Sequence, residues 1–191
     1  MGQVVSYFRE PETFTKLGAR LRKGILLYGP SGTGKTMLAK ALANEAGVNF
    51  LYKSASEFVE MYVGVGPRRI RDLFDKAKSI SPCIVFIDEI DALGCRDTSK
   101  DPYGRTNEER NATVNQLLVE IDGFNENDRV VVVGATNRET FLDFALVRSG
   151  RFDLKFKVDL PSKEERQGIL TIKLARSKWE GEEEDIVWVA E

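Results

Sequence analysis

Short apolar runs alternate with longer stretches of helical spacing along most of this chain. Continuous apolar runs are typical of strands that are covered on both faces, whereas a strand with one exposed face would alternate. The expected strands cover residues 25–28, 49–53, 83–87, 129–135 and, with an alternating pattern, 153–160. The expected helices cover residues 35–46, 68–79 and 112–121.

This alternation of strands and helices predicts an α/β fold, an αβα sandwich with a mainly parallel sheet. Two segments break the pattern. Residues 94–107 are polar and interrupted by proline and glycine, so we expect a loop there. Residues 177–191 carry the acidic run EGEEED and are either a frayed end or part of a further domain.

Composition excludes several classes of function. The 191 residues are 42% hydrophobic and 30% charged, as in a soluble globular domain, and no run approaches the length of a membrane span. The net charge of −2 gives no support for a nucleic-acid-binding surface. The chain contains no histidine, which excludes an HExxH zinc site or a Ser-His-Asp triad within it. Cys83 and Cys95 form no CxxC motif, so we expect two reduced thiols.

The segment GPSGTGKT, residues 29–36, matches the phosphate-binding pattern G-x-x-x-x-G-K-[ST] between an expected strand and an expected helix. Glycines let the backbone N–H groups face phosphate oxygens, and the following helix adds its positive N-terminal end. Lys35 would reach the β- and γ-phosphates, and Thr36 would offer its hydroxyl to Mg²⁺. The alternative is a glycine-rich turn without a ligand. The expected nucleotide-binding residues are Gly29, Pro30, Ser31, Gly32, Thr33, Gly34, Lys35, Thr36, Met37 and Asp88.

Polar residues also end two of the expected buried strands. Asp88 and Glu89 follow the run CIVFI, and ligands of open α/β sheets bind beyond the carboxyl ends of the strands. Asp88 would hold Mg²⁺ together with Thr36, and Glu89 would act as a general base. Asn137 follows the run VVVVGAT and would orient water against the γ-phosphate. The alternatives are a solvated acidic turn and an asparagine turn residue. Asp91 is expected to be a helix cap in the turn that follows.

Several long strings resemble the AAA family, and more narrowly its FtsH-type membrane-anchored proteases of bacteria, mitochondria and plastids. They are YFREPETFTKLGARLRKGILLYGPSGTGKT, FVEMYVGVGPRRIRDLFDKAK, PCIVFIDEIDALG, VNQLLVEIDGF and GATNRETFLDFALVRSGRFD. The similarity as a whole covers roughly residues 4–174. The resemblance implies a P-loop NTPase fold with ATP and Mg²⁺ as cofactors. It also implies identical or homologous subunits in a hexameric ring that pulls on unfolded polypeptide.

The resemblance further implies roles for residues that spacing alone does not identify. Arg148 and Arg151 match arginine fingers, which reach the ATP site of a neighbouring subunit through a head-to-tail contact. The alternative for each is a surface arginine paired with a carboxylate such as Asp153.

Two more segments match family features. Met61, Tyr62, Val63 and Gly64 match the loop that lines the central channel and grips substrate through its aromatic residue; the alternative is a core tyrosine under a loop. Asp122, Gly123 and Phe124 match a segment that communicates between neighbours, with a helix-end turn as the alternative.

The chain departs from the family pattern at four places. Ser31 replaces a P-loop proline at a variable position, where we expect binding to survive. The adenine-contacting strand-turn, most of the helical lid, and the membrane span with its zinc protease domain are expected to be missing. Residues 1–161 would thus form an N-terminally truncated ATPase core, and residues 162–191 the start of the lid with an acidic tail. Membrane contact, in a bacterial, mitochondrial or plastid membrane, would come only through the missing segments.

Two functions of different class fit these observations. The first is an ATP-hydrolysing motor module for polypeptide, favoured by the presence of Glu89, Asn137, Arg148 and Arg151. The second is a nucleotide-binding ring subunit that does not turn over, favoured by the missing lid and adenine contacts. The charge balance and the loop FVEMYVGVG argue against a DNA-handling relative.

Overall fold

The computed structural model describes residues 2–10, 23–59, 64–94, 105–124, 128–175 and 189. In chain order, the α-helices, strands and 3-10 helices (η) are α1 (Gly2–Arg9), β1 (Gly24–Tyr28), α3 (Lys35–Ala46), β2 (Asn49–Ser54), η1 (Ala55–Phe58), α4 (Val65–Ser79), β3 (Cys83–Asp88), α5 (Asp91–Gly94), α6 (Arg105–Asp122), β4 (Val130–Thr136), η3 (Glu139–Phe141), β5 (Leu154–Lys157) and α7 (Lys163–Leu174).

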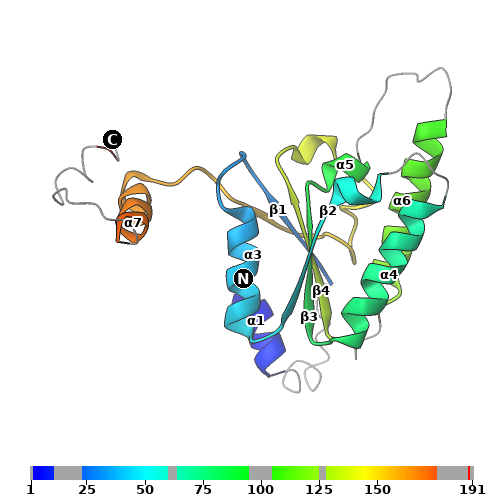
Figure 1. The fold of residues 1–191 in the computed structure, drawn as a ribbon, viewed down its shortest axis with the longest axis horizontal. Helices are drawn as coiled ribbons and strands as arrows, with labels where there is room; N and C mark the ends of the chain where they lie inside the picture. Colours follow the sequence, from blue (N-terminus) through cyan, green and yellow to red (C-terminus); the bar gives the residue numbers. More distant parts are fainter. Residues whose placement is uncertain are drawn as a thin grey trace. The chain divides into compact units, whose positions relative to one another are not determined.

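Within the described residues, five parallel strands form one sheet in the order β2-β3-β4-β1-β5. Parallel neighbours need crossover connections, and helices supply them. In Figure 1, α1 and α3 cover one face of the sheet, and α4 and α6 cover the other. The predicted αβα sandwich is therefore confirmed. Because all the strands run in the same direction, their carboxyl ends meet at one edge of the sheet.

Strand β3 is covered on both faces, which explains why its apolar run is continuous. Cys83, Val85 and Ile87 are fully buried in the cluster beneath α4 and α6, whereas Ile84 and Phe86 are fully buried in the cluster beneath α1 and α3. Successive side chains of a strand point to opposite faces, so helices on both sides require apolar residues at every position. Burying one such side chain contributes about 1.5–3 kcal/mol, which makes the strand a firm support for the residues at its tip.

Two helices begin earlier than predicted. α6 begins at Arg105, so the predicted loop at residues 94–107 is wrong at its end: the polar first turns of α6 lack an apolar period. α4 begins at Val65 and holds Pro67 in its first turn, where a missing N–H costs no intrahelical hydrogen bond. In both cases the sequence pattern does not indicate where the helix starts, and the tertiary structure stabilises its first turn.

The sequence pattern does not predict α1, and it predicts too long a last strand. Val4 and Phe8 of α1 are 4% exposed, and α1 packs against α3. β5 pairs with β1 only over Leu154–Lys157, after which Val158 N–H donates to the Tyr28 carbonyl at 2.8 Å. An isolated helix of eight residues is marginal in water, so α1 depends on packing its apolar residues against the surface that it meets.

The chain divides into two compact units, residues 1–158 and residues 159–191. The second unit contains helix α7, and this helix begins with a capping box, in which Ser162 and Glu165 each accept from the other's backbone N–H. The assignment of this unit to the start of a helical lid stays a prediction. In the part of the chain that the structure describes, no helix has both the length and the apolar character needed to cross a membrane.

Candidate functional site

The loop between β1 and α3 is shaped by its glycines. Gly29 has a φ of 149°, and a Cβ there would lie 2.0 Å from the Val158 carbonyl oxygen. Gly34, with a φ of 90°, is the N-cap of α3 in the left-handed conformation. Thr33 Oγ1 donates to the Pro30 carbonyl at 3.0 Å and closes the turn. Side chains at Gly29 and Gly34 would therefore strain this loop.

Lys35 is the first residue of α3, and its side chain is only 7% exposed. Its ammonium group donates to the Gly29 and Pro30 carbonyls at 2.9 and 2.7 Å and to Asn137 Oδ1 at 2.7 Å. Burial lowers the pKa of Lys35, and the charges of Asp88 and Asp91 partly oppose that effect. The three hydrogen-bond acceptors are neutral, so a buried cation here is solvated by the loop but not neutralised by direct contact.

The carboxylate of Asp88 is held at both oxygens. Thr36 Oγ1 donates to its Oδ2 at 2.9 Å, and the Glu89 N–H donates to its Oδ1 at 3.0 Å. Glu89 itself is exposed and has a φ of 53°, a left-handed conformation that is uncommon outside glycine. The acidic pair thus points one carboxylate toward the loop and leaves the other at the surface.

The end of β4 meets these groups at the same edge. Asn137, which follows Thr136, accepts from Lys35, while Thr136 Oγ1 donates to Asp91 Oδ1 at 2.8 Å. Asp91 was expected to cap a helix; it is the first residue of α5, and its carboxylate binds the hydroxyl at the tip of β4. The structure therefore brings Lys35, Thr36, Asp88 and Asn137 together through direct hydrogen bonds.

The remaining predicted nucleotide-binding residues surround this group. Pro30, Ser31 and Gly32 are exposed at the turn of the loop. Met37 is 70% exposed on the first turn of α3. These residues lie at the surface, where they are accessible to a ligand.

Tyr52 on the edge strand β2 also lies beside the acidic pair. Its strand pairs with β3, so that Ser54 stands opposite Asp88. The ring of Tyr52 is stacked on Phe86 at 6.0 Å and is 47% exposed. Partial burial raises the pKa of Tyr52, and the carboxylates of Asp88, Glu89 and Glu57 add to the effect. No pattern in the sequence marks this residue.

The two candidate arginine fingers lie in another part of the molecule. The exposed Arg148 guanidinium lies 5.5 Å from the centre of the Phe144 ring, and Phe144 is itself 60% exposed. Arg151 donates to both carboxylate oxygens of Asp122, at 3.0 and 2.7 Å, and to the Ala145 carbonyl at 2.8 Å. The alternative for Arg151 was pairing with a carboxylate such as Asp153. The carboxylate that it pairs with is Asp122.

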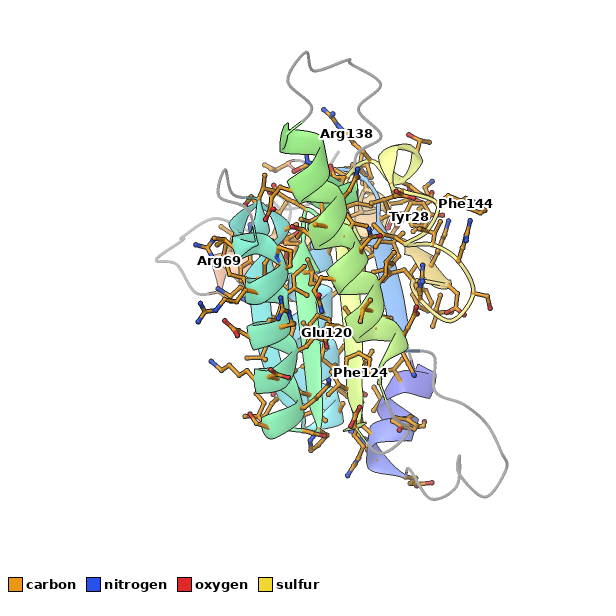
Figure 2. All side chains as sticks on the ribbon, turned by 90° about the vertical axis from the view of Figure 1, so that its right-hand side faces the viewer. Tyr28, Arg69, Glu120, Phe124, Arg138 and Phe144 are labelled. Carbon is orange, nitrogen blue, oxygen red and sulfur yellow. The ribbon has the colours of Figure 1, made fainter. Side chains whose placement is uncertain are left out.

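The segment after α6 packs into the core. Phe124 is 5% exposed and packs on Phe74, with ring centres 5.5 Å apart. The ammonium group of Lys23 donates to the Phe124 carbonyl, and that of Lys78 lies 5.8 Å from the Phe124 ring. In Figure 2, Phe124 lies at the end of α6 opposite Arg138. Packing alone accounts for Phe124, while Asp122 retains the contact with Arg151.

Of the expected substrate loop, only Gly64 is described; Met61, Tyr62 and Val63 lie outside the described residues. Gly64 is the N-cap of α4, with a φ of 85°, and its N–H lies 3.0 Å from both carboxylate oxygens of Glu109. Glu109 is 8% exposed, although no local feature of the sequence distinguishes it from neighbouring glutamates.

The environment of Cys83 does not favour reaction of its thiol. Cys83 is fully buried in β3, and burial raises the pKa of its thiol to about 11. The reactive thiolate is therefore scarce near neutral pH. Cys95 lies outside the described residues.

Comparisons with known proteins agree with this geometry. Residues 25–160 match the profile of the ATPase family associated with various cellular activities (AAA). The chain is 55% identical over 188 residues to the ATP-dependent zinc metalloprotease FtsH of Trieres chinensis, covering 98% of this chain and 29% of that protein. It is 55% identical over 178 residues to the chloroplastic ATP-dependent zinc metalloprotease FTSH 8 of Arabidopsis thaliana, covering 93% of this chain and 26% of that protein. The chain therefore spans less than a third of the length of these curated relatives.

Proposed function

This chain belongs to the AAA family of ATPases, and on that premise we propose that it binds Mg²⁺-ATP at the carboxyl edge of its sheet and hydrolyses it. The observation that carries the proposal is the set of hydrogen bonds that joins three strand ends. Lys35 bonds to Asn137 at 2.7 Å, and Thr36 bonds to Asp88 at 2.9 Å. A phosphate-binding loop, a cation and a carboxylate thus share one edge.

The residues at this edge fit a triphosphate. The ammonium of Lys35 has neutral partners that an anion would replace with a stronger, charge-assisted contact. The N-terminus of α3, behind the glycine loop, favours negative charge. A side chain at Gly29 would collide with the Val158 carbonyl, so only glycine lets the loop lie this close to the residue that follows β5. ATP would be held by residues 29–36.

Thr36 and Asp88 fit a magnesium ion. Mg²⁺ prefers oxygen ligands and takes few from the protein, and these two side chains offer a hydroxyl and a carboxylate 2.9 Å apart. When bound, the ion neutralises part of the charge on the phosphates.

Two further side chains have roles in the proposed reaction. Glu89 is the candidate general base, because it is exposed beside Asp88 and can take a proton from an attacking water. Asn137 carries no charge and already holds Lys35 through its amide oxygen, so it can orient both a phosphate-binding cation and a water. Their separation along the edge follows from the register of β3 and β4.

Arg148 and Arg151 are proposed to act on a neighbouring subunit in a hexameric ring. The position of Arg148 supports this arrangement, because its guanidinium lies at the surface on the exposed Phe144 ring. Arg151 is bound within the chain to Asp122 and Ala145, as the alternative of a carboxylate-paired arginine predicts. A head-to-tail contact between copies generates a closed ring when its rotation fits. Gel filtration of Glu89→Gln with ATP tests assembly, and a species that elutes only as a monomer argues against the ring.

We also propose that the ring uses hydrolysis to pull on unfolded polypeptide. The curated relatives are named as ATP-dependent zinc metalloproteases, and the shared part is an ATPase region. These 191 residues contain no histidine, so an HExxH zinc site cannot lie in them. Peptide cleavage is accordingly assigned to other parts of such proteins, whereas this chain supplies the ATP-driven step.

The alternative, a ring subunit that binds nucleotide without turnover, is separated by steady-state kinetics. We expect Mg²⁺-dependent phosphate release from the wild type at high protein concentration and a loss of about 10²–10⁴-fold in Glu89→Gln, the range for removing a general base. The matched control is Glu45→Gln on the exposed side of α3. Wild-type phosphate release that does not depend on Mg²⁺ and does not exceed that of Glu89→Gln would favour the structural role.

A further inference from the structure

The carboxylate of Asp91 bridges two elements at the edge of the sheet. Asp91 is the first residue of α5, and its Oδ1 accepts a hydrogen bond of 2.8 Å from the hydroxyl of Thr136 at the end of β4. Thr136 is 1% exposed, so its hydroxyl needs a partner within the protein. A hydrogen bond to a carboxylate is charge-assisted and about twice as strong as one between neutral groups.

The same hydroxyl also fixes the chain beyond β4. The Arg138 N–H donates to Thr136 Oγ1 at 2.9 Å. A hydroxyl has a single proton to donate, and Thr136 donates it to Asp91. The lone pairs of the Thr136 oxygen therefore remain available to accept from the Arg138 N–H. Asn137 stands between these two anchored residues, and its amide oxygen lies 2.7 Å from the Lys35 ammonium. The orientation of Asn137 therefore depends on a contact made by Asp91.

The turn that carries Glu89 is tied to the same point. The Ile90 N–H donates to the Ala135 carbonyl at 2.9 Å, and the Ala92 N–H donates to the Glu89 carbonyl at 2.8 Å. Glu89 adopts a φ of 53°, which costs conformational energy unless its surroundings hold it. Asp91 lies two residues further along and adds a side-chain hydrogen bond between the turn and β4.

We propose that Asp91 is a positioning residue for ATP hydrolysis: through Thr136 it holds the Glu89 turn at a set distance from Asn137. The proposal rests on the proposed function, in which those two side chains act on the attacking water. A misplacement of about 1 Å in such a pair can cost about a hundredfold in rate. Asp91 also contributes negative charge that opposes the lowering of the Lys35 pKa.

Four variants of the full chain separate the hydrogen bond from the charge. Asp91→Ala and Thr136→Val remove the bond, and we expect each to lower kcat about tenfold or more, with KM for ATP changed less than about twofold. Asp91→Asn and Thr136→Ser keep an acceptor and a hydroxyl, and they should retain most of kcat. The double variant Asp91→Ala/Thr136→Val should be no slower than the slower single variant, because one interaction is lost in both.

The matched control is Asp72→Ala, an exposed aspartate of α4 that lies 3.9 Å from Arg68 and should leave kcat unchanged. Independent, multiplicative effects of the two single substitutions would overturn the proposal. So would a rise in KM without a fall in kcat, because it would mean that Asp91 serves nucleotide binding.

Hydrogen exchange at the Arg138 N–H gives a readout that needs no turnover. It should become about tenfold faster in Asp91→Ala and Thr136→Val and stay unchanged in Asp91→Asn. Unchanged exchange in Asp91→Ala would refute the positioning role whatever the kinetics. If exchange changes as expected but the wild type releases no phosphate, Asp91 positions Asn137 and the hydrolytic function fails instead.

Discussion

The basic side chains at the carboxyl edge of the sheet and in the turn at residues 142–151 differ in their exposure and in their partners. At the edge, Lys35 is 7% exposed and is surrounded by two loop carbonyls and the Asn137 amide. At the turn, Arg148 lies at the surface on the exposed Phe144 ring. Arg151 lies beside it and is bound to Asp122 on α6.

This difference teaches which parts of an ATP site one chain can assemble. Parallel strands end at a common edge, so groups that follow β1, β3 and β4 meet within a single chain. The arginines follow β4 at a greater distance along the chain, and their side chains bond to α6, to the turn itself and to an aromatic ring. The comparison predicts that the phosphate-binding part of the site forms within one chain and that turnover requires a second copy.

The largest expected effect is a loss of turnover that a second variant restores. Arg148→Ala should lower kcat about 10³-fold with little change in ATP affinity, because the guanidinium acts on the transferring phosphoryl group. Mixing it with the inactive Glu89→Gln should restore phosphate release, since roughly a quarter of the contacts in a random ring pair an intact Glu89 with an intact Arg148. Arg68→Ala, on the exposed face of α4, is the control.

Mixed assemblies that remain as inactive as each variant alone would break the comparison, because Arg148 would then act within its own chain or not at all.

The next effect concerns binding at the edge. Lys35→Ala removes a buried cation with three hydrogen bonds, and we expect ATP affinity to fall about a hundredfold or more. Lys40→Ala, on the exposed side of the same helix, should bind as the wild type does. Calorimetric titration measures both, and unchanged ATP affinity in Lys35→Ala would remove Lys35 from the site.

A smaller effect follows from the pKa of Lys35, which burial lowers below that of an exposed lysine. Its ammonium group therefore loses its proton at a lower pH than usual, so ATP affinity should weaken as the pH rises from about 7 to about 10. Lys35→Arg stays charged in this range and should show a flatter profile. Parallel profiles for both proteins would assign the pH dependence to another group.

The smallest effect is expected at the arginine side. The hydrogen bonds from Arg151 lower the pKa of Asp122, so this pair stabilises the fold above the usual aspartate pKa and loses that contribution as the pH falls through the lowered value. Asp122 is 50% exposed, so solvent screening should limit the cost of Asp122→Asn to below about 1 kcal/mol. Urea unfolding at neutral and at acid pH tests this, because the difference from the wild type should vanish in acid.

The elements that the sequence predicts well are those with a local reason. The run at β3 is apolar at every position because helices cover both faces, and residues 29–36 are rich in glycine because the loop bends sharply. The positions of Lys35 and Asp88 on one edge also follow from the sequence, once the strands are taken as parallel.

Other features depend on partners that are distant along the chain. α1 is buried because it meets α3, and α6 begins early where Glu109 binds the Gly64 N–H. Arg151 pairs with Asp122, 29 residues earlier, although Asp153 is nearer in sequence. The expected role of residues 61–63 stays a prediction, because they lie outside the described residues.

By itself, the sequence determined the parallel α/β sandwich, the phosphate-binding loop and the edge at which its chemistry gathers, because periodicity and glycine spacing are local properties of the chain. Only the tertiary structure decided that Asp91 bonds to Thr136, that Asn137 holds Lys35 and that Arg151 is paired within the chain. The physical reason is that a hydrogen bond depends on positions within about 3 Å, and such distances arise only when strands and helices far apart in sequence have packed.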